Sequence, residues 1–199
     1  SNGHLLVNLD STYTLSDMVP ATAGSMTGTA NLTNETWPLS ITAGSNALRI
    51  KVGSVTASST LALPAGSYAS ATELAAALET AANLDPVLRS AKAFVSVSVT
   101  SAGTLQITSR TLGSGSAVSL VSADAALESL FGLSGAALVS GVNASGKING
   151  AVATSSGAQL RGALGSVTEG LAVAVGAYPQ DSTVVVTRGI FDRLTEVLE

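Results

Sequence analysis

The hydrophobic pattern is strongest in residues 70–83, SATELAAALETAAN, where apolar side chains recur every three or four positions. That spacing places them on one stripe of an α-helix. The stripe consists of Leu74, Ala77, Leu78, Ala81 and Ala82. Ser70 and Glu73 have the spacing of a capping box, in which each satisfies the other's backbone N–H, and Pro86 follows as a stop signal. Because an isolated helix of this length is marginal in water, the pattern predicts that the stripe packs on a sheet.

Period-two alternation of apolar and polar residues on both sides of this helix predicts the strands of that sheet. In residues 47–53, ALRIKVG, the apolar residues alternate with Arg49 and Lys51, which we interpret as solvated charges on an outer face. Residues 94–100 alternate in the same way, and a turn leads from them into the strand candidate 104–109. Further strands are expected at 39–44, 58–63, 117–121 and 182–187.

A second, shorter helix is predicted for residues 124–131, with Asp124 as its N-terminal cap and Gly132 at its end. A further apolar stripe near the C-terminus indicates the start of another helix and consists of Ile190, Leu194, Val197 and Leu198. The block around the long helix has the order strand, strand, helix, strand, strand. These elements predict an α+β fold that is mainly antiparallel β, with one long and one short helix and the start of a C-terminal helix.

Glycine and small polar residues mark the segments where the hydrophobic pattern is weakest. Residues 5–9 and 12–19 are short strand candidates, whereas 21–34 is expected to be a loop or an irregular edge. Towards the C-terminus, glycines punctuate short strand candidates and are expected to occupy turns: Gly150, Gly157, Gly162, Gly165, Gly170 and Gly176. Glycine therefore divides this part of the chain into short strands.

Composition narrows the class of protein. The 199 residues are 46% hydrophobic, but only 4% are aromatic and 11% are charged, which is typical of a β-rich extracellular or assembly protein rather than of a metabolic enzyme. The net charge of -4 argues against nucleic acid as a partner, because phosphate binding needs clustered Lys and Arg. No apolar run has the length of a membrane span, and no cleavable signal peptide is visible.

Candidate catalytic chemistry is sparse. There is no cysteine, and we interpret the single histidine, His4, as an exposed bystander without partners for metal binding or proton transfer. The acidic residues considered as catalytic groups have no acidic neighbour or paired base close in sequence: Asp85, Asp124, Asp181 and Asp192. The glycine-rich stretch 112–116 lacks the lysine and the helix start of a phosphate loop, so it is interpreted as a plain loop. We therefore expect no enzyme activity and no catalytic, cofactor-binding or metal site.

The segment 141–189 resembles the flagellar filament cap protein family, also called hook-associated protein 2. The features in common are, in order, Ile148-Asn149-Gly150, Ser156-Gly157 with Leu160 and Gly162, Glu169-Gly170-Leu171, and the strand VVVTRG at 184–189 before a helix. The preceding block is similar to the flagellin hook IN module, through ALRIKVG, TLALPAGSYASATELAAALETAAN, VSVSV, GTLQITS and LGSGSAV. Together these matches cover about residues 38–199.

The resemblance implies a domain arrangement and a role. Residues 1–35 and 142–188 would form an outer β-rich domain, 36–141 an inserted α+β hook IN-like module, and 189–199 the start of a truncated coiled-coil helix. The protein would be a structural head-domain fragment of the filament cap, an extracellular homo-oligomeric ring at the filament tip that assists the assembly of flagellin. It would be exported by the flagellar secretion apparatus without a cleaved signal peptide, and the absence of cysteine suits export as an unfolded chain.

Two alternatives stay open at this point. The first is an extracellular adhesive or carbohydrate-binding module that meets a host surface or glycan, with Trp37 or Tyr178 stacking on a sugar. Packing roles are expected for both rings, because aromatic residues supply much of the packing energy in so aromatic-poor a chain. The second is the variable outer region of a flagellin or of a hook–filament junction protein, since the hook IN module occurs there too. The order of the motifs in 141–189 favours the cap.

Overall fold

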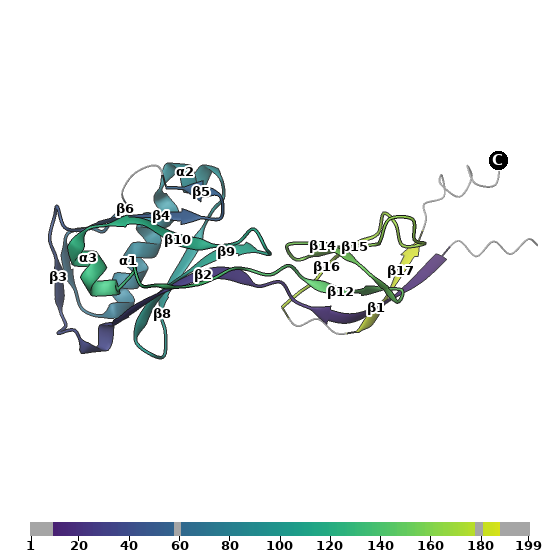
Figure 1. Ribbon diagram of the computed structural model, residues 1–199, viewed down its shortest axis with the longest axis horizontal. Coiled ribbons are helices and arrows are strands. Elements are labelled where there is room, and N and C mark those ends of the chain that lie inside the picture. Colours follow the sequence, from purple (N-terminus) through teal and green to yellow (C-terminus); the bar gives the residue numbers. More distant parts are fainter. Residues whose placement is uncertain (1–9, 58–60, 178–180, 188–199) are drawn as a thin grey trace, which may run out of the picture. The chain divides into compact units, whose positions relative to one another are not determined.

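The computed structural model describes residues 10–57, 61–177 and 181–187, and it confirms the α+β class with mainly antiparallel strands (Figure 1). The chain divides into two compact units. Unit 1 combines residues 1–20 with 144–199, and unit 2 consists of residues 21–143. Unit 2 is therefore inserted in the sequence of unit 1. The expected strand at 5–9 and the expected helix at 189–199 lie outside the described residues.

The main sheet of unit 2 has the strand order β11–β2–β9–β8, and all of its pairs are antiparallel. Its strands are β11 (Ala137–Val139), β2 (Ala23–Asn31), β9 (Thr104–Leu112) and β8 (Val95–Val99). The predicted β8–β9 hairpin is confirmed, with Val97 opposite Ile107. This sheet contains the alternating segments that the sequence predicted on the C-terminal side of the long helix.

The expectation of a loop or irregular edge at 21–34 is wrong, because β2 occupies most of that segment. It lies between β11 and β9 and places Met26 in the core with no exposed surface. The 3₁₀ turn Leu32–Asn34 follows the strand. Strand pairing on both sides thus overrides the weak local preference of a sequence rich in Gly, Thr and Ala. Residues 21–35, expected in the outer domain, accordingly belong to unit 2.

The second sheet of unit 2 is built on β4 (Ala47–Val52). It pairs with β10 (Val118–Ala123), β5 (Val55–Thr56) and β6 (Leu61–Ala62). A separate antiparallel pair joins β3 (Leu39–Ile41) to β7 (Gly66–Tyr68). The strands predicted at 39–44 and 47–53 are therefore present, but they pair with later parts of the chain rather than with each other.

The long helix α1 (Ala71–Leu84) forms as predicted, with Leu74 and Leu78 fully buried. Ser70 Oγ accepts a hydrogen bond from the Glu73 N–H at 3.2 Å, which confirms half of the predicted capping box. The Glu73 carboxylate accepts instead from the N–H of Ala69, at 2.7 Å, because it reaches one residue further back than expected. The first interaction satisfies a backbone donor that the first helical turn leaves without an intrahelical acceptor, and the second satisfies the N–H of the residue before the cap.

Two shorter helices complete unit 2. Pro86 does not simply stop α1 but begins α2 (Pro86–Ser90), where a missing N–H costs nothing in the first turn. The predicted short helix is confirmed as α3 (Ala125–Phe131), and Gly132 ends it in the left-handed conformation at φ 62°. One hydrophobic cluster joins the helices to both sheets, and its largest fully buried members are Met26, Leu32, Leu48, Ile50, Leu63, Leu74, Leu78, Leu88, Leu105, Ile107, Leu127 and Phe131.

Unit 1 consists of short antiparallel strands around a small core. One sheet has the order β13 (Ala151–Val152), β12 (Ser145–Ile148), β1 (Asp10–Val19) and β17 (Ser182–Thr187). A second sheet contains β14 (Thr154–Ser156), β15 (Gln159–Arg161) and β16 (Ala172–Ala174). The predicted strand at 182–187 is thus confirmed. Among its described residues the core contains Leu15, Ala144, Ile148, Leu160 and Val175.

Most of the predicted turn glycines in unit 1 have the backbone conformation that only glycine adopts easily: Gly150, Gly157, Gly165 and Gly170 all have positive φ. Gly162 is different. It is buried, and a side chain there would collide with the backbone of Thr168. Glycine at this position allows the backbone to approach that of Thr168 closely, whereas the sequence predicted only a turn here.

We predict that a fragment of residues 21–143 folds on its own, whereas one of residues 36–141 is much less stable. The longer fragment keeps β2 between β11 and β9, but the shorter one removes β2, so that β11 loses its partner in the sheet and β9 keeps only β8. Backbone amide dispersion and hydrogen-exchange protection, measured by NMR on both fragments, check this result. Equal protection in the two fragments would show that β2 contributes little to the fold of unit 2.

Candidate functional site

The acidic side chains that the sequence offers as candidates have structural partners. Asp85 is only 5% exposed, and its carboxylate accepts hydrogen bonds from the N–H groups of Val87 and Leu88, at 3.0 and 2.9 Å. Asp124 precedes α3, but its side chain accepts from the N–H of Ala47, at 2.8 Å, rather than capping that helix. The Asp85 carboxylate thus caps the start of α2, and the Asp124 carboxylate links the residue before α3 to β4. Asp181 is exposed, and Asp192 and His4 lie outside the described residues.

The two basic residues of β4 differ in environment. Lys51 is exposed, as expected for a solvated charge. Arg49 is half-buried, and its Nε donates a hydrogen bond to the carbonyl oxygen of Ala57 at 2.9 Å. The outward-facing interpretation therefore holds for Lys51, whereas Arg49 links β4 to the segment that follows β5.

The aromatic residues considered for sugar stacking do not form an exposed platform in the described part of the chain. Trp37 is half-buried against the core of unit 2, and its Nε1 donates to the carbonyl oxygen of Leu32 at 3.3 Å. The packing role expected for Trp37 is thus confirmed. Tyr178, the other candidate, lies outside the described residues.

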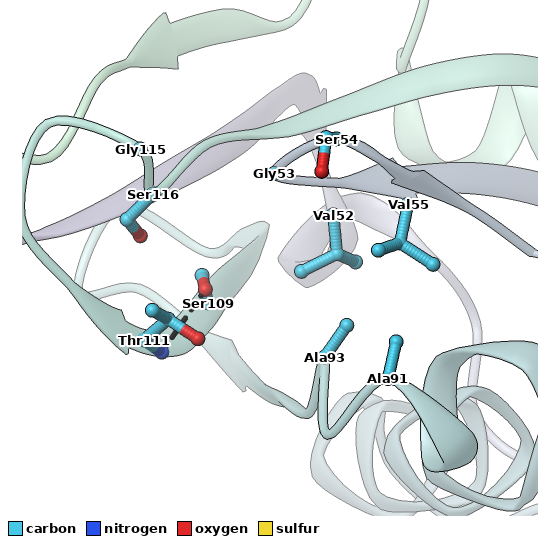
Figure 2. Close-up of a pocket in the computed structure, with 10 residues that line it drawn as sticks. All are labelled: Val52, Gly53, Ser54, Val55, Ala91, Ala93, Ser109, Thr111, Gly115 and Ser116. Carbon is cyan, nitrogen blue, oxygen red and sulfur yellow. Dashed lines mark hydrogen bonds between the residues drawn. The ribbon is translucent and has the colours of Figure 1, made fainter.

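Figure 2 shows a pocket in unit 2 between β9, the 113–117 loop, the β4–β5 turn and the residues that follow α2, with a volume of about 170 Å³. Its walls combine four hydroxyl side chains with small apolar ones: Ser54, Ser109, Thr111 and Ser116, with Val52, Val55, Ala91 and Ala93. The hydroxyl oxygen of Ser116 accepts from the N–H of Gly24 at 2.8 Å. None of the residues that line this pocket is acidic, basic or a histidine, so the pocket has no group for proton transfer at neutral pH.

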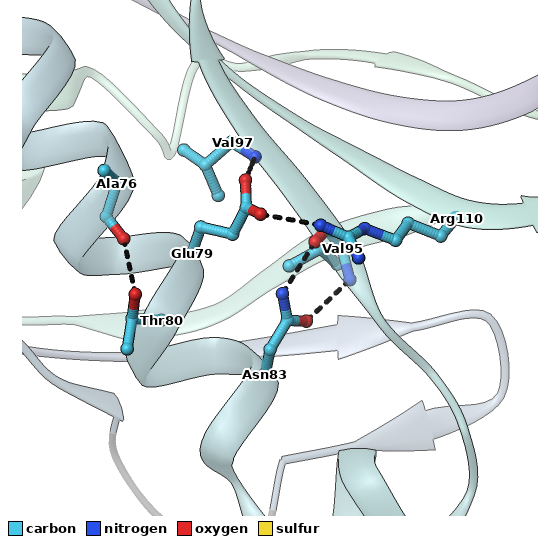
Figure 3. Close-up of polar contacts among 7 residues, drawn as sticks. All are labelled: Ala76, Glu79, Thr80, Asn83, Val95, Val97 and Arg110. Carbon is cyan, nitrogen blue, oxygen red and sulfur yellow. Dashed lines mark hydrogen bonds and ion pairs between the residues drawn. The ribbon is translucent and has the colours of Figure 1, made fainter.

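A polar cluster links α1 to the sheet beside it, as Figure 3 shows. Asn83 makes two hydrogen bonds to the backbone of Val95. The carboxylate of Glu79 accepts hydrogen bonds from the N–H of Val97 and from the guanidinium group of Arg110. This cluster was not predicted from the sequence. Its only local signal is that Glu79 and Asn83 stand four residues apart, which places both side chains on the same face of the helix.

The described residues contain no group of three or more His, Cys, Asp or Glu side chains arranged to hold a metal ion. None of the helices in the same residues is long and apolar enough to cross a membrane.

One ion pair raises a pKa in unit 1. Lys147 Nζ lies 2.7 Å from an Asp17 carboxylate oxygen, across the β1–β12 pair. The hydrogen bond to Asp17, and then its negative charge, raise the pKa of the Lys147 ammonium group above its ordinary value. Because both side chains are well exposed, we expect the pair to contribute little to stability.

Tyr68 gives a prediction for alkaline pH. Burial, and then the charge of Glu73, raise the pKa of its hydroxyl above 10.0. The stability that the neutral hydroxyl provides is therefore complete below pH 10.0 and is lost as the pH rises through the folded-state pKa. Replacing Tyr68 by phenylalanine removes a hydrogen bond to the Pro64 carbonyl (2.7 Å), which we expect to cost about 0.5–1.5 kcal/mol at pH 7.

Urea denaturation of the wild type and of Tyr68→Phe at pH 7 and at pH values above 10 measures this effect. The stability difference is expected to shrink at the alkaline values, because only the wild type must keep an ionisable hydroxyl protonated. If the difference in unfolding free energy between the wild type and Tyr68→Phe stays the same across this pH range, the raised pKa of Tyr68 is contradicted.

Comparison with known proteins gives a result at the level of structure. No family model matches the sequence, and no curated protein matches it. Two solved structures do match, and both are crystal structures of the D2–D3 domains of the flagellar cap protein FliD from Serratia marcescens, in two crystal forms. One is 16% identical, with a TM-score of 0.52, and covers 89% of this chain and 93% of its own. The other is 14% identical, with a TM-score of 0.53, and covers 92% and 96%.

The α+β fold of this chain, with its two units, is therefore that of domains of a flagellar structural protein. In particular, the chain has the fold of the D2–D3 domains of FliD over about nine-tenths of its length. The resemblance to the filament cap family inferred from motifs is thus confirmed in three dimensions, and the similar proteins are structural proteins rather than enzymes.

Proposed function

We propose that this chain is the head part of a flagellar filament cap subunit. The observation that carries the proposal is the structural match of this chain, over a length that includes both units, to the D2–D3 domains of a cap protein. Coverage of 89% and 92% includes unit 1 as well as unit 2, so the likeness is not limited to one common module. The ordered motifs at 148–150, 169–171 and 184–189 support the same family.

In this role the protein acts by binding and shape rather than by chemistry. Unit 1 is the outer β-rich domain and unit 2 the inserted hook IN-like module, and the parent protein forms a ring at the extracellular tip of the filament. There the ring assists flagellin subunits to assemble. A chain without cysteine passes through a narrow export channel with no risk of cross-linking, which supports export by the flagellar secretion apparatus.

The location of the protein on the flagellum separates this proposal from its closest alternatives. In the source bacterium, an epitope is inserted at Gly44, an exposed turn residue with no neighbouring atom within 4 Å of an added Cβ. Immunogold electron microscopy is then expected to label only the filament tips. Label along the whole filament would identify a flagellin, and label at the hook–filament junction would identify a junction protein.

A deletion strain tests the assembly role separately from the location. Without the gene that encodes this chain, we expect filaments to be absent or short and flagellin to appear in the culture medium. Complementation with the intact gene should restore filaments, and a gene lacking residues 21–143 serves as the matched comparison for the contribution of unit 2. Normal filaments in the deletion strain would reject the proposal.

We predict that the chain described here is mainly monomeric in isolation, while the full parent protein forms a ring. A closed ring needs a head-to-tail interface, and small interfaces between polar head domains are usually transient. Light scattering across a range of concentrations, on this chain and on the parent protein, checks the prediction. A stable oligomer of this chain at all concentrations would contradict it.

A further inference from the structure

The main sheet of unit 2 ends in two different ways. At one end β11 is only three residues long, and a short edge strand offers little backbone for pairing with another chain. At the other end β8 has five residues in regular antiparallel register with β9. Because hydrogen bonds alternate along an antiparallel strand, Val95, Val97 and Val99 direct their backbone groups to the side away from β9. This outer side of β8 is the longer potential pairing edge of the sheet.

Two side chains of helix α1 form hydrogen bonds with the backbone of that edge, in the place where a neighbouring strand would pair (Figure 3). Asn83 Oδ1 accepts from the N–H of Val95, and Asn83 Nδ2 donates to the carbonyl oxygen of the same residue, both at 2.9 Å. Two residues along the strand, Glu79 Oε2 accepts from the N–H of Val97 at 2.8 Å. The amide of Asn83 thus makes the same pair of hydrogen bonds to Val95 that the backbone N–H and C=O of one residue in an added antiparallel strand would make.

The carboxylate of Glu79 is held in place from a second direction. Its other oxygen lies 2.7 Å from a guanidinium nitrogen of Arg110, on the adjacent strand β9. Since Arg110 also donates its backbone N–H to the carbonyl oxygen of Phe94, at 2.9 Å, the residue is fixed next to β8. Arg110 therefore orients Glu79 toward the strand edge.

The sequence of β8 identifies the chain that best fits the edge. Residues 95–99 read VSVSV and are the same in both directions, so two copies can pair antiparallel about a two-fold axis through Val97. In that pair Val95 faces Val99 of the other copy, and serine faces serine on the opposite side. Each face of the joined sheet is then chemically matched, which is the condition for a self-complementary two-fold interface.

We infer that the outer edge of β8 is a latent pairing surface for β8 of a second copy, and that Glu79 and Asn83 keep it closed. Leu74, Ala75 and Leu78 anchor α1 in the core up to its middle, whereas in the remaining half, which covers the edge, Ala82 is the only buried side chain and it is small. Loss of the two polar side chains frees that half to move aside and leaves backbone groups of β8 to pair with another chain. This inference concerns association of the isolated chain and does not depend on the proposed role in the flagellum.

The test is the double variant Glu79→Ala/Asn83→Ala, with Thr80→Ala as the matched control. Thr80 is exposed on the same helix, and its hydroxyl bonds only to the Ala76 carbonyl of that helix among the described contacts. We expect light scattering to give a concentration-dependent shift toward twice the monomer mass for the double variant and no shift for the control. The single variants Glu79→Ala and Asn83→Ala give the same reading if the double variant does not fold. A folded variant with unchanged mass would overturn the inference.

The site of pairing is tested with cysteines, because the natural chain contains none. Two-fold pairing through Val97 places Ser96 of one copy opposite Ser98 of the other at a position without hydrogen bonds, where side chains are closest. In the double-variant background, a mixture of Ser96→Cys and Ser98→Cys copies is therefore expected to form disulfide-linked dimers. Each variant alone is expected to cross-link much less. Equal cross-linking in all three samples, or dimers that persist after Val99→Pro removes an outward N–H, would contradict pairing in this register.

Discussion

Replacing Leu78 by alanine is expected to lower the free energy of unfolding by about 2–5 kcal/mol. Leu78 has no exposed surface and belongs to the cluster that joins α1 to both sheets of unit 2. Truncation removes the transfer free energy of the lost atoms and leaves a cavity that the surrounding core fills only in part. Urea denaturation, followed by far-UV circular dichroism, measures the change.

Leu84→Ala is the matched control, because it is the same substitution in the same helix at a side chain that is 63% exposed. Its effect is expected to be within about 0.5 kcal/mol of zero, as is usual for surface positions. Similar losses for the two variants would show that the apolar stripe does not define the buried face of α1.

The helix and its packing face were predictable from the sequence because the signal is local. Leu74 and Leu78 repeat with helical spacing, and Ser70 caps the first turn. In the structure the two leucine side chains are fully buried. The β8–β9 hairpin was predictable for a similar reason, since alternation and a short turn are encoded in one continuous stretch. In each case one continuous segment contains both the local secondary-structure preference and the hydrophobic pattern that predict the element.

Strand β2 was not predictable because what stabilises it is distant in the sequence. Its partners are β9 and β11, from Thr104 and Ala137 onward, and its own residues are mostly small or polar. The covered edge of β8 was missed for the same reason. The hydrogen bonds of Asn83 to Val95 depend on where α1 lies beside the sheet, and no spacing within the helix specifies that position.

The role of Gly24 also depends on a contact that is distant in the sequence, and replacing this residue is the second change expected to have a large effect on stability. The sequence marks it only as part of a glycine-containing segment, yet in the structure it lies against the loop that follows β9. Its N–H donates to Ser116 Oγ at 2.8 Å. A Cβ added at Gly24 would lie 2.6 Å from the Ser116 carbonyl carbon and 2.7 Å from Ala117 Cα, closer than folded proteins allow.

We therefore expect Gly24→Ala to lower the free energy of unfolding by about 1–3 kcal/mol, because β2 or the loop must move to admit the methyl group. The obstacle is backbone on the loop side, so no rotation of a side chain can relieve it. Hydrogen-exchange protection is expected to fall first at the amides of Gly24 and Gly141, since the Gly141 N–H donates to the Ser116 carbonyl oxygen at 2.8 Å.

Gly115→Ala provides the control within the same loop, since an added Cβ there meets no atom within 4 Å. At such a position alanine restricts the unfolded chain more than glycine does, so we expect no loss of stability or a small gain of up to about 1 kcal/mol. Denaturation midpoints of the two variants and of the wild type give the comparison. If Gly24→Ala unfolds at the same denaturant concentration as Gly115→Ala, β2 does not need glycine to approach this loop, and its place in the sheet has another cause.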